Sequence, residues 1–171
     1  DGSLRLTSFA KCKKHTDEKR LDSEEGLLRL AVSDGETGAI KTLYELEFAD
    51  SVYLLCATLW HNKQLMQDFS CNSFIRIHDP AEFGRRVSLH VPGFRTGGEG
   101  PCMYQHLRLI EARLPEEAAT ADTSSERSER AKIQALVQQY ALFLKHRAFS
   151  HQAEYRLVWL SDSKDLPEHL D

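Results

Sequence analysis

Apolar and polar positions follow one another along the chain in a pattern that predicts several short strands. Residues 3–9 alternate apolar and polar side chains, a period of two that is typical of a half-buried strand. Residues 52–59 form a continuous apolar run rich in strand-forming side chains, which predicts a central strand covered on both faces. Residues 27–32 and 39–48 are two further apolar segments, separated by residues that favour turns.

The middle of the chain is expected to combine short elements with loops. A short helix is expected over residues 62–69, and two strands over residues 73–77 and 87–91 with an Asp-Pro turn between them. Residues 92–101 contain four glycines and two prolines without a continuous apolar face, which favours a loop. A strand is expected over residues 102–112, before a second loop rich in Ala, Ser, Thr and Glu.

The C-terminal third predicts one long helix followed by a strand. From Ser128 to about Arg147, apolar side chains recur at intervals of three and four residues, which places them on one helical face. These residues are Ile133, Leu136, Val137, Tyr140, Ala141 and Leu144. Residues 154–160 return to a period of two. Together these elements predict an α+β fold, in which a mixed, largely antiparallel sheet core is packed against a long helix in the C-terminal half.

Length and composition favour an ordinary globular domain. A chain of 171 residues is long enough to bury a core of its own, so residues 1–171 are expected to form a single domain. The chain begins at Asp1 without a methionine, which leaves room for an additional N-terminal strand upstream. The formal net charge of −4 gives no overall attraction to nucleic acid or to an anionic membrane.

The cysteines and the absence of long apolar stretches indicate a cytoplasmic location. The four cysteines are scattered without a paired short spacing, which favours reduced thiols over a disulfide framework. No stretch approaches the roughly 20 apolar residues of a membrane span, and the first residues lack the features of a signal peptide. We therefore expect no contact with a membrane.

The segment from Lys145 to Leu160 contains the best candidates for chemistry. It is expected to be a junction between a helix and a strand, with Glu154 as the first residue of the strand. Glu154 and Arg156 are two residues apart, so they share one face of the strand and form either an ion pair or a joint site. A carboxylate there can stabilise a developing positive charge. The alternative is that Glu154 only orients the strand by pairing with Arg156 or Lys145.

Other chemical signals are weak. Residues 17–25 contain several carboxylates, but their spacing matches no calcium-binding loop, and no pair of cysteines and histidines has the spacing of a zinc site, so no metal is expected. The glycine-rich segment 92–101 lacks the Lys-Ser or Lys-Thr of a phosphate loop. Hydrolysis of nucleoside triphosphates is therefore disfavoured.

Over most of its length the chain resembles a large bacterial family catalogued as domain of unknown function 2971, and the closing motif is the most specific part of the resemblance. That family begins with a strand like the Leu-Arg-Leu-Thr-Ser-Phe of residues 4–9, continues with an acidic loop, and has a middle strand like the Leu-Cys-Ala-Thr of residues 55–58. It ends with a lysine, an aromatic residue and a Glu-Tyr-Arg strand start. In this chain these are Lys145, Phe149, Glu154, Tyr155 and Arg156.

A more distant resemblance is to ADP-ribosyltransferases of the Arg-Ser-Glu type. Arg5, Thr58 and the Gln-Ala-Glu of residues 152–154 match that pattern in order and in expected structure. The resemblance implies that NAD is the substrate and that Arg5 binds its pyrophosphate. It also implies that Thr58 steadies the glutamate, that Glu154 holds a ribose hydroxyl as nicotinamide leaves, and that Gln152 orients the acceptor.

The sequence thus leaves three functions open. The first is an NAD-consuming ADP-ribosyltransferase-like enzyme, a bacterial toxin or defence component that modifies protein or nucleic acid. The second is a non-catalytic domain that binds a ligand or partner through Glu154 and Arg156. The third is a metal-dependent nuclease that uses the acidic segment 17–25.

Overall fold

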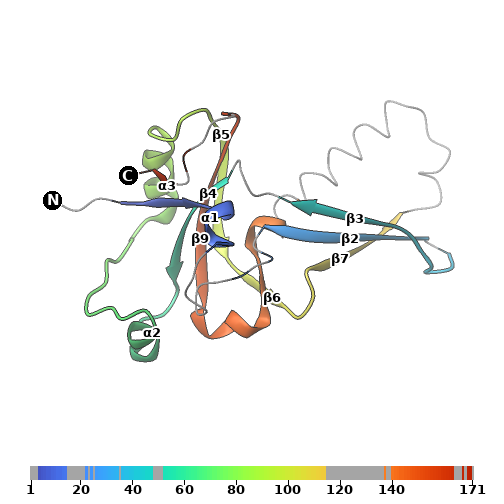
Figure 1. Cartoon of the computed structure of the whole chain (residues 1–171), viewed down its shortest axis with the longest axis horizontal. Coiled ribbons are helices and arrows are strands. Elements are labelled where there is room, and N and C mark those ends of the chain that lie inside the picture. The colour runs from blue at the N-terminus through green and yellow to red at the C-terminus, as the bar shows by residue number, and fades with distance from the viewer. Residues whose placement is uncertain are drawn as a thin grey trace.

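Strands dominate the part of the chain that the structure describes. The structure is a computed structural model, and the described residues are 4–14, 22, 24, 26–34, 36–47, 52–114, 137, 140–163, 167, 169 and 170. Their strands belong to three sheets of five, three and two strands (Figure 1). Among them, no helix is long and apolar enough to cross a membrane.

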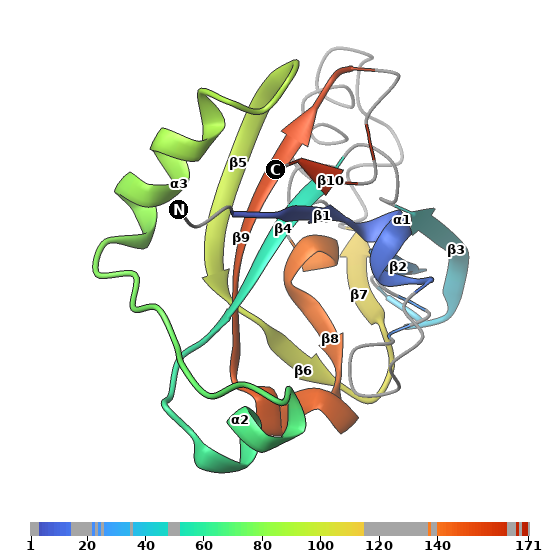
Figure 2. The same ribbon diagram turned by 60° about the vertical axis from the view of Figure 1, so that its left-hand side comes forward.

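The largest sheet has five strands, in the order β10-β1-β4-β9-β5, and every neighbouring pair is antiparallel. Figure 2 shows β4, β9 and β5 side by side, with the short β1 crossing beside β4. The strands span His169–Leu170 (β10), Leu6–Ser8 (β1), Val52–Thr58 (β4), Glu154–Ser161 (β9) and Phe94–Pro101 (β5). The expected strands at residues 52–59 and 154–160 are therefore confirmed, and β4 is the middle strand of this sheet.

Two smaller sheets complete the fold. β2 (Leu27–Asp34) lies between β3 (Ile40–Glu47), to which it is antiparallel, and β7 (Leu109–Leu114), to which it is parallel. This three-stranded sheet extends away from the five-stranded sheet (Figure 1). β6 (Met103–Gln105) and β8 (Leu144–His146) form a short parallel pair. The labelled helices are α1 (Phe9–Cys12), α2 (Lys63–Asp68), α3 (Pro80–Ser88) and the 3-10 helix η2 (Arg147–Gln152).

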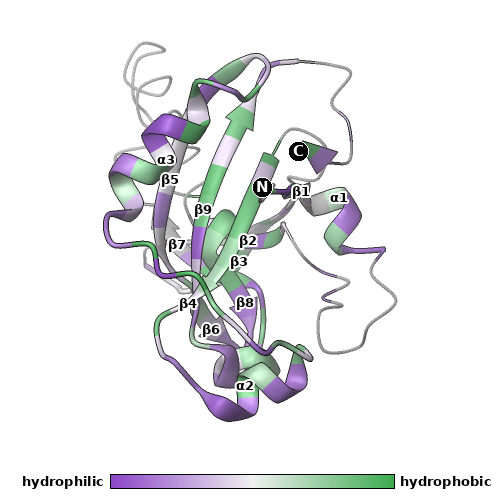
Figure 3. Ribbon diagram, turned by 90° about the vertical axis from the view of Figure 1, so that its left-hand side faces the viewer, coloured by the Kyte–Doolittle hydropathy of each residue, from purple (hydrophilic) through white to green (hydrophobic). Residues whose placement is uncertain are grey.

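Both faces of the five-stranded sheet are covered where β4 begins. Tyr53 and Trp159 point to one face and pack with Val91, near the partly buried Phe83 of α3. The opposite face packs against the segment that precedes β8, through Leu142 and its neighbours. Figure 3 shows green, apolar stretches along β4 and β9, beside the partly purple ribbon of α3. The apolar run at residues 52–59 thus reflects a strand that is buried on both sides at its start.

The expected fold class is wrong, because sheets dominate and no long helix packs against them in the described part of the chain. The only described helix of seven or more residues is α3, at Pro80–Ser88. Of the expected helix over residues 128–147, only residue 137 and residues 140–143 are described as helical; residues 128–136, 138 and 139 lie outside the described residues. The chain then changes to strand β8 and to η2.

The periodic apolar positions of that segment nevertheless pack together. Val137, Ala141 and Leu144 bury themselves against Leu28 and Leu30 of β2. The spacing therefore identified a buried face correctly, but Leu144 reaches that face from a strand. The hydrogen-bonding partner that makes it a strand is β6, about forty residues earlier in the chain.

Three further expectations for the middle of the chain are wrong. Residues 92–101 were expected to be a loop, and most of them form β5. Residues 87–91 were expected to be a strand, and they are the end of α3 and the turn after it. Residues 73–77 form no strand. The short helix expected at residues 62–69 is confirmed as α2, whose first turn is capped by the Asn62 side chain.

Candidate functional site

The chain reverses direction between β8 and β9, and this reversal builds the candidate site. The imidazole Nδ1 of His146 accepts a hydrogen bond from the Ala148 N–H at 3.2 Å, which caps the first turn of η2. Ala153 ends η2 in the left-handed conformation, with φ 43° and ψ 49°. The junction was expected to run from a helix to a strand, and it consists instead of β8, the 3-10 helix η2 and β9. This arrangement brings the side chains of Lys145 and Glu154 together.

Four side chains form the junction cluster, which we define as Lys145, Gln152, Glu154 and Arg156. The ammonium of Lys145 contacts Glu154 Oε2 and donates to Gln152 Oε1 at 2.8 Å. The Arg156 guanidinium Nε donates to Glu154 Oε1 at 2.5 Å. The Lys145, Glu154 and Arg156 side chains are only 7%, 4% and 0% exposed. Glu154 thus pairs with both cations that the sequence offered as its partners.

The carboxylate of Glu154 is held in its charged form. Burial alone would raise its pKa, but Arg156 and Lys145 outweigh burial through charge attraction and hydrogen bonding, and they lower the pKa to about 2. The group is therefore ionised at neutral pH inside a nearly dry environment. A desolvated carboxylate with specific charged partners is typical of functional sites, although buried structural ion pairs share this property.

Hydrogen bonds from the surrounding backbone fix the junction cluster in place. The Glu154 N–H donates to the Tyr104 hydroxyl at 2.7 Å, and the Glu154 carbonyl accepts from the Cys102 N–H at 2.8 Å. Arg156 Nη1 donates to the Leu142 carbonyl at 2.8 Å. Burial raises the pKa of Tyr104 above its ordinary value. The start of β9 is thus anchored to β6 on one side and to the segment before β8 on the other.

Three of the four residues expected at the site lie close together. Thr58 is the register partner of Glu154 across β4 and β9, and its hydroxyl donates to the Gln152 carbonyl at 2.9 Å. Thr58 therefore supports the turn that carries Gln152 and Glu154. Arg5 is exposed and directly precedes β1, whose Thr7 pairs with Leu54 of β4. The structure brings Thr58, Gln152 and Glu154 together.

Tyr104 belongs to the site but was not expected there. It lies in a segment that the sequence predicts only as a strand, and its contact with Glu154 spans 50 residues. No local spacing could have connected the two residues. Lys145 could be anticipated, because a positive charge near the start of the strand is an evident partner for Glu154.

An exposed aromatic surface continues from Thr58. The Trp60 side chain is 68% exposed, and its backbone N–H lies 3.4 Å from the Thr58 hydroxyl, to which it donates. The rings of His61 and Phe74 lie 4.9 Å apart at 44°. An exposed aromatic face next to buried polar groups can stack against a planar ring of a ligand.

The acidic segment expected to suit a nuclease lies largely outside the described residues. Residues 15–21, 23 and 25 are not described. Of the described acids, Asp22 contacts the buried Arg108, and Glu24 pairs with Arg29 at 3.1 Å. Within the described ranges, no group of three or more His, Cys, Asp or Glu side chains is placed to hold a metal ion.

No family model matches the chain, and no curated protein or solved structure matches it either. The two resemblances described from the sequence therefore rest on the motifs of this chain alone. The function of the chain has to be inferred from the junction cluster and its surroundings.

Proposed function

We propose that the chain is an ADP-ribosyltransferase-like enzyme that consumes NAD. The observation that supports this proposal best is the meeting of Thr58, Gln152 and Glu154 at one end of β4 and β9. These three residues come from segments separated by 94 positions, and they match the order expected from the resemblance. The ionised Glu154 supplies the negative charge that such a reaction requires.

The chemistry uses the fixed charge of Glu154. When the bond between the ribose carbon and the nicotinamide nitrogen breaks, its electron pair leaves with nicotinamide, and positive charge develops on the ribose. A preorganised carboxylate stabilises that charge more effectively in a desolvated site than in water. In the proposed reaction a ribose hydroxyl takes the place of the Lys145 ammonium at Glu154 Oε2. The side chain of Gln152 then orients a protein or nucleic-acid acceptor.

A second candidate function is favoured by a different observation. Both carboxylate oxygens of Glu154 already contact cations, and the side chain is 4% exposed. This arrangement suits a group that organises the fold. In that case the chain is a non-catalytic domain that binds a ligand or partner on the exposed aromatic surface beside Thr58.

The two candidates are separated by measuring nicotinamide release from labelled NAD. For the enzyme we expect release by the wild type and a loss of about 100-fold or more in Glu154→Gln, because one charge-stabilising contact is worth that much in the rate. Glu82→Gln is the matched control, since Glu82 is a partly exposed residue of α3 whose carboxylate pairs with Arg85 and Arg86 of the same helix. Undiminished release in Glu154→Gln, or no release by the wild type, overturns the proposal.

A second variant keeps the test valid if Glu154→Gln fails to fold. Gln152→Ala leaves the contacts of Glu154 with Lys145 and Arg156 in place. We expect this variant to release nicotinamide but to transfer less label to an acceptor. Equal transfer of label to the acceptor by Gln152→Ala and the wild type would show that Gln152 does not orient the acceptor.

A further inference from the structure

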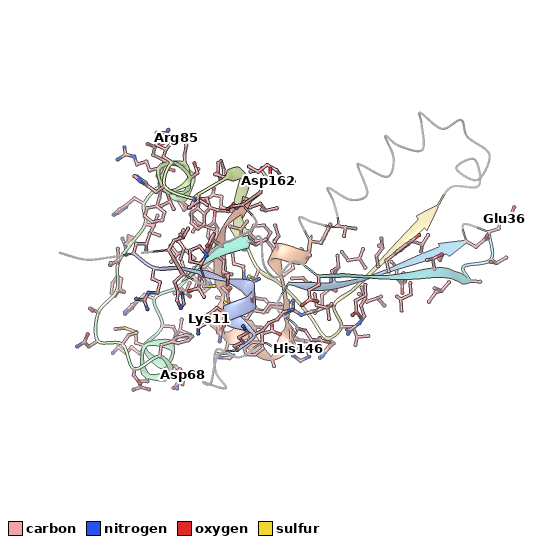
Figure 4. All side chains as sticks on the ribbon, turned by 45° about the horizontal axis from the view of Figure 1, so that its top comes forward. Lys11, Glu36, Asp68, Arg85, His146 and Asp162 are labelled. Atoms are coloured by element: carbon pink, nitrogen blue, oxygen red, sulfur yellow. The ribbon has the colours of Figure 1, made fainter. Side chains whose placement is uncertain are left out.

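A group of basic side chains lies on the surface next to the junction cluster. Arg147 is the first residue of η2, and its Nη1 is 3.0 Å from Nε2 of His106. The rings of His106 and His146 are 6.5 Å apart and nearly perpendicular, at 76°. Figure 4 labels His146 on the side of the molecule opposite Arg85 of α3, and Figure 2 shows η2 beside β6 and β8. We call these three residues, His106, His146 and Arg147, the basic triad.

The hydrogen bonds of the basic triad leave N–H donors unused within the described part of the chain, and His106 and Arg147 are exposed. An arginine can only donate, so His106 Nε2 accepts in its contact with Arg147, and the proton of the neutral ring is on Nδ1. His146 Nδ1 accepts from the Ala148 N–H, so its ring proton is on Nε2. Each ring therefore keeps an N–H available. The guanidinium of Arg147 uses one of its five donors in this contact.

The partner of Arg147 sets it apart from several other exposed arginines. The exposed Arg85, Arg86 and Arg95 and the partly exposed Arg29 each contact a carboxylate. Arg147 contacts an imidazole, and within the described ranges no carboxylate lies within ion-pair distance of it. Its positive charge is therefore not neutralised by a described carboxylate and can attract an anion to the two histidines. The guanidinium of arginine holds phosphate through charge-assisted hydrogen bonds, and the N–H of a neutral imidazole adds a further donor.

We infer that the basic triad binds a phosphate ester. The ring centroids of His106 and His146 lie 6.5 Å apart and Arg147 contacts His106, so all three side chains are near enough to donate to one anion beside them. The site is next to Lys145, which precedes His146 in the chain and belongs to the junction cluster. The source of the phosphate rests on the proposed function: it is either the pyrophosphate of NAD or the backbone of a nucleic-acid acceptor. Both present the same group to the triad.

The test is calorimetric titration of the full chain with inorganic phosphate, ADP-ribose and a short single-stranded oligonucleotide. We expect Arg147→Gln to weaken binding of the probes about 10-fold or more, the usual effect of losing a charge-assisted hydrogen bond, and His106→Gln to weaken it in the same direction. Arg85→Gln is the control, because it removes the same charge from an exposed position elsewhere. We expect its dissociation constants to equal those of the wild type.

The outcomes separate this inference from the proposed function. An unchanged dissociation constant in Arg147→Gln, equal weakening in Arg85→Gln, or no binding of any probe overturns the phosphate site. Tighter binding of ADP-ribose than of the oligonucleotide identifies NAD as the source, and the reverse order identifies the nucleic acid. Probe binding without nicotinamide release supports the site and rejects the enzyme. Nicotinamide release that Arg147→Gln does not change, together with no binding of any probe, supports the enzyme and rejects the phosphate site.

Discussion

Thr58 stabilises the junction cluster through one hydrogen bond to the Gln152 carbonyl. Thr58→Val keeps the branched shape of the side chain and removes the hydroxyl donor. We expect the free energy of unfolding to fall by about 0.5–1.5 kcal/mol, the usual net value of such a bond, as measured by urea denaturation. If the proposed enzyme is correct, nicotinamide release should also decrease, because the turn that carries Gln152 and Glu154 loses its support.

The control for this substitution is Thr42→Val. Thr42 is exposed on β3, and its hydroxyl makes no hydrogen bond to the described residues. We expect its unfolding free energy to stay within about 0.5 kcal/mol of the wild type. An equal loss of stability in both variants would show that the Thr58 hydroxyl contributes nothing specific to the junction.

Individual residues of the candidate site differ in how far the sequence could foretell them. The pairing of Glu154 with Arg156 follows from the two-residue period of a strand, which places both side chains on one face. The contact between Thr58 and Gln152 needed the register of β4 against β9, which the sequence does not give. The burial of Glu154 was also out of reach, because it depends on the segment before β8 and on Tyr104.

The strand β5 shows how glycine can serve a strand instead of a loop. A Cβ atom at Gly97 would lie 2.7 Å from the carbonyl oxygen of Val158 in β9, closer than any real side chain allows. We therefore expect Gly97→Ala to lower the free energy of unfolding by about 1–3 kcal/mol, because β5 must shift away from β9 to relieve the overlap. Thermal or urea denaturation measures the loss.

Gly98 provides the matched comparison in the same strand. A Cβ atom there would meet Phe143 at 3.9 Å and the Val158 side chain at 4.0 Å, which are ordinary contacts. Gly98→Ala should therefore leave stability unchanged or raise it by up to about 1 kcal/mol, since alanine loses less conformational freedom on folding. Greater damage from Gly98→Ala than from Gly97→Ala would contradict the observed register of β5 on β9.

At the level of elements, the sequence was most informative where one local pattern dominated. The apolar run of β4 and the alternation of β9 sufficed to place both strands. Helix α3 was missed although its start carries a clear signal: the Asp79 side chain accepts from the Glu82 N–H at 2.9 Å, and Pro80 occupies the first turn. Interpreting Asp79 and Pro80 as a turn overlooked that cap. β8 was missed because its partner β6 is distant in sequence.

Across the whole molecule, buried charges hold the segments that converge on β8. Arg108 is fully buried, contacts Asp22 and donates to the Leu144 carbonyl of β8 at 2.8 Å. Lys145, the next residue of β8, contacts Glu154 of the five-stranded sheet. Breaking a buried pair leaves an uncompensated charge, which typically costs about 3–5 kcal/mol. The junction between the sheets therefore depends on buried ion pairs.

Acid should reveal the contribution of Glu154 to the stability of the whole protein. Its pKa is lowered from 4.5 to about 2 in the folded protein, so the folded state favours the ionised form. The resulting stability is fully present above the unfolded value of about 4.5 and is lost as the pH falls toward 2. One pKa unit corresponds to about 1.4 kcal/mol, so the loss is about 3 kcal/mol.

Glu154→Gln cannot titrate, and its unfolding free energy should therefore lack this component. Denaturant unfolding of both proteins at several values between pH 5 and pH 2 should show their stability difference shrinking as the pH falls. A constant difference across this range would mean that Glu154 is not held as a charged group between Lys145 and Arg156.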